Sequence, residues 1–127
     1  MEKEFVSYKQ AVALRELGFS DECLAHYDYY GRLPFPLVMY GDCECCDNSG
    51  EPAPLKQQVF RWFREYYWWY ANLSSWLQEE EGTYHEYEIY GTPDSAHGSI
   101  MFKTYEEAEN ACIDKLILIA KQQDNGR

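Results

Sequence analysis

The sequence predicts a small α+β fold, in which about three helices pack on a short antiparallel sheet of three to four strands. Three observations support this class: an aromatic run with helical periodicity, two capped helix starts, and short runs of strand-forming residues. The 127 residues are enough to form a hydrophobic core, so we expect a single domain over 1–127.

The central element is an aromatic helix. Residues 60–76 hold nine of the chain's 22 aromatic side chains. Pro54 suits the first turn of a helix, so we expect a helix from about Pro54 to Tyr67 or Tyr70. At about 100° per residue, one face of this helix gathers large apolar side chains and is expected to be buried. This face comprises Leu55, Val59, Trp62, Phe63, Tyr66 and Tyr70, with Lys56, Tyr67 and Trp69 at its borders.

Trp68 does not fit this buried face, because it falls on the opposite side of the helix. Either the helix ends near Tyr67, or Trp68 faces solvent or a partner. Asn72, Ser74 and Ser75 indicate a loop soon afterwards, which favours the early end.

An internal echo marks two further helix starts. Residues 5–11 and 102–108 both match F-x-[ST]-Y-x-[QE]-A, which contains a capping box. An ancient duplication would produce this echo, and so would two ordinary capping boxes that follow short strands.

The first of these starts pairs Ser7 with Gln10, and the helix is expected to run from about Tyr8 to Leu17. Gly18 then supplies a left-handed stop. The second pairs Thr104 with Glu107, and its helix is expected over residues 105–122. The apolar stripe of that last helix is wide, which predicts burial on more than one side; it comprises Ala108, Ala111, Cys112, Ile113, Leu116, Ile117, Ile119 and Ala120.

Strand-forming residues are found in four short runs, namely Cys23–Tyr27, Leu37–Tyr40, Tyr84–Tyr90 and Ile100–Phe102. In the third run, Glu86 and Glu88 fall on one face, which predicts a strand exposed on one side. Residues 91–98 are expected to form the turn between the last two runs.

Charge and hydropathy exclude several classes of function. The net charge of −11, from 22 acidic and 11 basic residues, argues against binding to nucleic acids and to anionic membrane surfaces. No apolar run is long enough to span a membrane, and the first residues do not resemble a signal peptide. We therefore expect a cytoplasmic protein with reduced cysteines. The acidic run Glu79–Glu81 is read as a solvated loop.

A predicted loop over 41–53 contains three cysteines, Cys43, Cys45 and Cys46. Thiolates bind zinc, and Cys23 with His26 could complete a site. However, C-x-C-C lacks the usual spacing of paired zinc ligands. A redox or thiol-reactive role is the other alternative for this loop, and the neighbouring acidic residues weaken it because they disfavour the thiolate. We expect neither a metal nor a cofactor, and keep a zinc-stabilised module as an alternative.

Enzyme signatures are missing from the sequence. It has no nucleophile elbow, phosphate-binding loop, dinucleotide fingerprint or zinc-protease motif. Its three histidines, His26, His85 and His97, lie in separate segments. The sequence therefore predicts a protein that is not an enzyme.

Three segments resemble a family of small proteins from bacterial genomes and from phages or mobile elements. They are FVSYKQAVALRELGF at 5–19, PLKQQVFRWFREYY at 54–67 and TYEEAENACIDKLILI at 104–119. The cysteine loop and the tryptophan-rich stretch after Tyr67 depart from that family's pattern. The resemblance implies a genomic setting, and it carries over neither an activity nor a catalytic residue.

Two functions are compatible with these features. The first is a small accessory protein that binds a host protein, with Trp68, Trp69 and Trp76 as anchors flanked by Arg61 and Arg64. The alternative is a protein that binds or sequesters a nucleotide or metabolite, since aromatic rings stack on bases and arginine binds phosphate.

Overall fold

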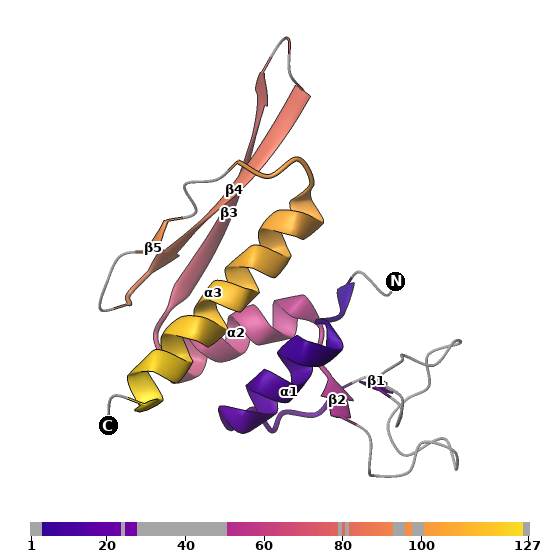
Figure 1. The fold of residues 1–127 in the computed structure, drawn as a ribbon, viewed down its shortest axis with the longest axis vertical. Helices are drawn as coiled ribbons and strands as arrows, with labels where there is room; N and C mark the ends of the chain where they lie inside the picture. The colour runs from indigo at the N-terminus through magenta and orange to yellow at the C-terminus, as the bar shows by residue number, and fades with distance from the viewer. Residues whose placement is uncertain are drawn as a thin grey trace. The chain divides into compact units, whose positions relative to one another are not determined.

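The computed structural model describes residues 4–23, 25–27, 51–78, 80, 82–92, 96–97 and 101–125. These residues form three helices and five strands (Figure 1). In chain order the elements are α1 (Tyr8–Glu16), β1 (Ala25–Tyr27), β2 (Glu51–Ala53), α2 (Lys56–Tyr66), β3 (Tyr70–Gln78), β4 (Gly82–Tyr90), β5 (Ala96–His97) and α3 (Tyr105–Asn125). The α+β class predicted from the sequence is confirmed.

The strands are divided between two antiparallel sheets. One consists of β1 and β2, and the other has the order β3-β4-β5. The chain also clusters into two compact units, Met1–Val59 and Phe60–Arg127, and the boundary falls within α2. The expectation of a single domain stays a prediction.

In the first unit, α1 begins and ends as its sequence predicts. The backbone N–H of Gln10 donates to Ser7 Oγ at 3.2 Å, and the Ser7 N–H donates to Gln10 Oε1 at 2.9 Å. At the other end, the N–H of Phe19 donates to the Leu14 carbonyl at 2.9 Å. Gly18 between them has a φ of 103°, which completes a Schellman motif.

The start of α2 differs from the prediction because the preceding residues are extended. The N–H of Val6 donates to the Pro54 carbonyl at 3.1 Å, and Phe5 forms an antiparallel bridge with Leu55. Pro54 and Leu55 therefore pair with another segment, and the helix begins only at Lys56.

The small sheet of the first unit contains one predicted strand and one that was not predicted. β1 lies within the predicted run at 23–27, and its Ala25 pairs with Ala53 of β2. β2 falls inside the predicted loop at 41–53, so that prediction is wrong for its last three residues. Residues 41–50 and the candidate strand at 37–40 lie outside the described residues.

The second unit is built on the β3–β4 hairpin. The strands pair along nine residues each, beginning with Tyr70 opposite Tyr90. β4 confirms the strand predicted at 84–90, whereas β3 lies where Asn72 and Ser74 had predicted a loop. That prediction is wrong because pairing with β4 satisfies the backbone of these polar residues, whatever their local preference.

One face of the hairpin packs on α3, which runs along it (Figure 1). Tyr87 and Ile89 of β4 are buried on this face. Most of the predicted stripe of α3 is buried too, namely Ala108, Cys112, Ile113, Leu116, Ile117 and Ala120, while Ala111 and Ile119 are half-buried. Although α3 has 21 residues, neither it nor another helix in the described part of the chain is long and apolar enough to cross a membrane.

Two predictions between β4 and α3 need correction. β5 lies inside the segment predicted as a turn at 91–98, where it pairs with β4. The strand predicted at 100–102 reduces to one antiparallel bridge between Phe102 and His85, with both N–H···O distances at 2.8 Å. Phe102 thus ties the start of α3 to the hairpin.

Candidate functional site

The buried face predicted for α2 is confirmed over its first turns and wrong at its end. Val59, Trp62 and Phe63 are buried. Tyr66, however, is 66% exposed, and Tyr70 belongs to β3 and is 46% exposed. Tyr70 lies beyond the end of the helix, so the helical periodicity does not apply to it, and Tyr66 is exposed as the last helical residue.

An aromatic cluster closes the core of the second unit at this helix end. Trp69 stacks on Phe63 with ring centroids 6.0 Å apart, and Tyr67 lies 4.5 Å from Trp69. Trp62 meets Phe63 edge-on at 4.9 Å. Since Trp69 is only 3% exposed, it is a core residue and cannot serve as the surface anchor that the sequence suggested.

Trp68, between two residues of this cluster, has an unusual backbone conformation. Among the described residues it is the single non-glycine residue with a positive φ, at 62°. The turn is closed by the Trp69 N–H, which donates to the Phe63 carbonyl at 3.3 Å. The left-handed residue thus lets Tyr67 and Trp69 both reach the core while Trp68 stays 72% exposed. Such a conformation costs an ordinary residue about 1–2 kcal/mol.

Gly91 holds this turn against the end of the hairpin. Its φ is 92°, and a Cβ there would overlap the carbonyl oxygen of Trp68 and lie 3.7 Å from the Cα of Trp69. Gly91 directly follows Tyr90, which is 49% exposed and pairs with Tyr70. Trp68, Tyr70 and Tyr90 are therefore three exposed aromatic residues whose backbones meet at this end of the hairpin, and we call them the aromatic corner.

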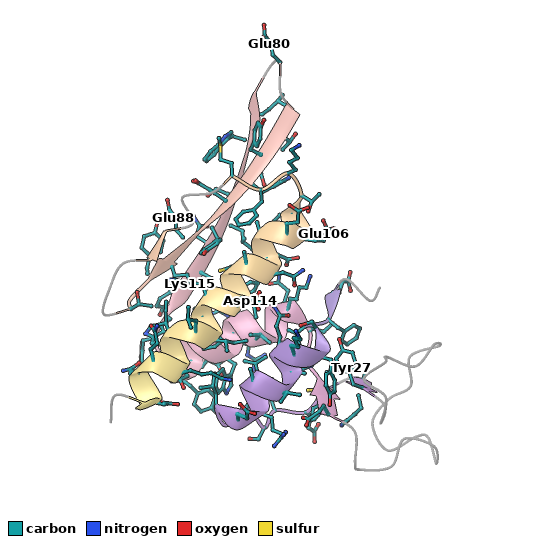
Figure 2. The ribbon with its side chains drawn as sticks, viewed as in Figure 1. Tyr27, Glu80, Glu88, Glu106, Asp114 and Lys115 are labelled. Carbon is teal, nitrogen blue, oxygen red and sulfur yellow. The ribbon has the colours of Figure 1, made fainter. Side chains whose placement is uncertain are left out.

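Carboxylates border the aromatic corner along β4. The Tyr90 hydroxyl donates a hydrogen bond to the Glu88 carboxylate, and this bond raises the pKa of Tyr90. Glu86 follows on the same side of the strand, since it lies two residues away. Figure 2 shows Glu88 on the side of the hairpin away from α3. The corner is thus apolar with an acidic border.

The two arginines predicted to flank the tryptophans both lie on the exposed side of α2. Arg61 pairs with Glu65 at 3.1 Å, and the two side chains are 69% and 53% exposed. A solvated pair of this kind contributes little to stability. Arg64 is also exposed and lies in the last turn of α2.

The structure separates Trp76 from the aromatic corner. Trp76 is 38% exposed and pairs with Tyr84. It lies six residues beyond Tyr70 along β3, which corresponds to roughly 20 Å. It is therefore nearer to the hairpin tip, where Figure 2 places Glu80. The predicted anchors are divided between two surface positions and the core.

One polar contact was not predicted from the sequence. Ser75 Oγ and His85 Nδ1 are 2.6 Å apart across the hairpin, and the His85 ring meets Tyr105 edge-on at 5.9 Å. A serine–histidine pair can act as a nucleophile and its base when a third group orients the imidazole. Within the described part of the chain, the contacts of His85 are this serine, Tyr105 and the backbone of Phe102, none of which is a carboxylate. The pair can be found only from the register of the two strands.

The described cysteines are buried thiols. Burial is the main reason that the pKa of Cys23 and of Cys112 rises to about 12, so both stay protonated near neutral pH. No group of three or more potential metal ligands occurs among the described residues. The other three cysteines of the zinc hypothesis, Cys43, Cys45 and Cys46, lie outside those residues, so that hypothesis stays untested.

No family model, curated protein or solved structure matches this chain. The resemblance to small phage and mobile-element proteins therefore stays a prediction. The function must therefore be argued from the structure. The aromatic corner is the best candidate site, because its side chains are exposed and contribute little to the core.

Proposed function

We propose that this chain is a small interaction protein that binds a host protein through the aromatic corner, with Trp68 as the anchor. One observation carries the proposal: a 72% exposed indole occupies a left-handed position that glycine would fill with less strain. Because the Trp68 ring is largely exposed, its packing against the core offsets little of that strain. Backbone strain of this kind concentrates at functional sites, and tryptophan and tyrosine are the residues that anchor interfaces.

The chemistry of the corner indicates the kind of partner. Trp68, Tyr70 and Tyr90 offer apolar rings, while Glu86 and Glu88 border them on β4. A chain with a net charge of −11 attracts a basic protein surface over a distance. The proposed partner therefore has an apolar pocket with a lysine- or arginine-rich rim. The proposal also places the protein in the cytoplasm, as a phage or mobile-element accessory factor without enzymatic activity.

The test is a pull-down from host lysate with quantitative mass spectrometry, using the tagged full chain and two variants. We expect Trp68→Ala to lower the affinity for the enriched protein at least about tenfold, since anchors of this type contribute 2 kcal/mol or more. Trp76→Ala is the matched control, because it removes another exposed tryptophan outside the corner. Raised salt should slow association if the acidic border steers the partner.

Other outcomes would replace this proposal. Loss of binding in Trp76→Ala, with Trp68→Ala unchanged, would move the site to the hairpin tip. If neither variant changes binding, the exposed tryptophans are not anchors and the proposal fails. If no protein is enriched, a thermal-shift screen with nucleotides tests the small-ligand alternative, for which Arg61 or Arg64 would bind the phosphate.

A further inference from the structure

β3 is an edge strand with an unusual composition. The sheet has the order β3-β4-β5, so within the described residues β3 is paired on one side only. Its sequence, YANLSSWLQ, contains no charged residue and no proline. Natural edge strands usually carry such residues because they prevent pairing with another chain. A nine-residue edge without them is a template for strand pairing.

We propose that the occupant of this edge is β3 of a second copy, paired antiparallel about a two-fold axis at Leu73. In this register Tyr70 lies opposite Trp76 of the second copy, and Asn72 lies opposite its Ser74. Each of these pairs occurs twice, and Leu73 faces its own counterpart. The register therefore contains two aromatic pairs, two polar pairs and one apolar pair. Cross-strand pairs of these kinds stabilise sheets.

The strand itself selects this register. A two-fold axis requires that the same residues match in both directions. If the axis lay at Ser74 instead, Trp76 would face Asn72, and Tyr70 would face Gln78. Both aromatic pairs would then be replaced by an aromatic ring opposite an amide. Of these two axes, the one at Leu73 matches the aromatic residues with each other and Asn72 with Ser74, and it also places Ala71 opposite Ser75.

Charge does not prevent this pairing, although each chain has a net charge of −11. The nearest carboxylates on this sheet face, Glu86 and Glu88, lie on β4. In the pair, the β4 strands of the two copies would be separated by three strand spacings, or about 14 Å. This distance exceeds the Debye length of about 8 Å at physiological ionic strength. Salt above the physiological level should therefore have little effect on the self-pairing, whereas it should weaken an interaction with a basic host protein.

The exposed area predicts a weak pair. Tyr70 is 46% exposed and Trp76 is 38% exposed. Since a buried aromatic ring covers about 150–250 Å², these residues in two copies expose roughly 350 Å². Stable interfaces bury at least about 1,200 Å². The dimer is therefore expected to depend on protein concentration.

The test is sedimentation velocity on the purified full chain from about 10 µM to about 1 mM, a range in which weak complexes dissociate. Asn72→Lys/Ser74→Lys is made together with Glu86→Gln/Glu88→Gln, because Glu88 and Glu86 lie opposite Asn72 and Ser74 in the hairpin and would pair with the lysines. The combined variant brings like charges directly opposite each other in the proposed register. Glu86→Gln/Glu88→Gln alone is the matched control. We expect the native chain and the control to dimerise, and the lysine variant to need at least about tenfold more protein.

Two further measurements keep the proposal open to refutation. A mixture of the lysine variant with Asn72→Glu/Ser74→Glu, made in the same Glu86→Gln/Glu88→Gln background, should form a hybrid dimer, because opposite charges then face each other. Hydrogen exchange of residues 70–78 in the native chain should slow as protein concentration rises, which decides the matter if a variant does not fold. A native chain that stays monomeric up to about 1 mM, or lysine substitutions without effect on the dimer, would overturn the proposal.

Self-pairing and host binding can fail separately. Trp68→Ala changes the aromatic corner but no residue of β3, so it should leave the dimer unchanged. The sedimentation experiment contains no host protein, so its outcome does not depend on the proposed function.

Discussion

The ends of α1 and α2 make the same kind of turn with different residues in the left-handed position. In both, a left-handed residue follows the helix and the next residue is a buried aromatic side chain: Phe19 after Gly18, and Trp69 after Trp68. Glycine suits this position because it has no Cβ. Tryptophan does not, and its ring is left largely exposed. The comparison shows that the turn requires the conformation but not the indole, which is the main support for a binding role of Trp68.

The two turns also differ in how far they enter the left-handed region. Gly18 has a φ of 103°, whereas Trp68 has a φ of 62°. The second value lies in the narrow left-handed well that ordinary residues can occupy at a cost. Gly91 makes this possible in part, because it leaves room for the Trp68 carbonyl. The α2 turn is therefore supported by a glycine in a neighbouring segment rather than by one of its own.

The largest expected effect separates the two adjacent tryptophans. Trp69→Ala should lower the free energy of unfolding by about 4 kcal/mol, because it leaves a cavity in the aromatic cluster. Trp68→Ala should change it by less than about 0.5 kcal/mol, since an exposed ring is lost and the backbone strain remains. Urea denaturation of both variants measures the difference. Equal losses would mean that Trp68 also packs against the core.

Gly91→Ala comes next and tests the support of the α2 turn. The added Cβ overlaps the carbonyl oxygen of Trp68, and the alanine must also keep the positive φ of Gly91. We expect a loss of about 3 kcal/mol in the free energy of unfolding, measured by urea denaturation. A loss below about 1 kcal/mol would show that the turn can shift away from Gly91.

Gly18→Ala tests the α1 turn, where only the conformation is at stake. No atom lies within 4 Å of a Cβ at this position, so the added methyl group meets no neighbour. The loss should be about 1.5 kcal/mol, which is roughly half of that expected for Gly91→Ala. Thermal unfolding of the two alanine variants side by side gives the ratio. A larger loss for Gly18→Ala would reverse the expected order.

Trp68→Gly should give a small effect of the opposite sign. Relief of the left-handed strain should outweigh the greater freedom of glycine in the unfolded chain, for a gain of about 0.5–1 kcal/mol. The melting temperature should rise, while binding to the host partner falls as it does for Trp68→Ala. A destabilised glycine variant would mean that the indole contributes to the fold, and the binding argument would lose its basis.

The two segments that share a sequence pattern, residues 5–11 and 102–108, also share a local structure. Phe5 and Phe102 each form a single antiparallel bridge, with Leu55 and His85 respectively. A capped helix starts three residues after each phenylalanine. Duplication and coincidence both predict this shared form, so the choice between them stays open.

The hairpin illustrates what local sequence could not predict. Asn72 and Ser74 have low strand propensity, yet both lie in the middle of a nine-residue strand. The contact between Ser75 and His85 depends on the same register. Pairing partners that are distant in sequence decide such features, and no short window contains that information.

By itself, the sequence determined the α+β class, the capped start and glycine stop of α1, the strand at 84–90 and the buried stripe of α3. These features arise from interactions within a few residues or from periodicity along one element. Only the tertiary structure decided that 70–78 is a strand paired with β4, and that Trp69 is buried while Trp68 is exposed. The physical reason is that a strand is stabilised by its partner, and the direction of a side chain after a helix depends on the turn that closes it.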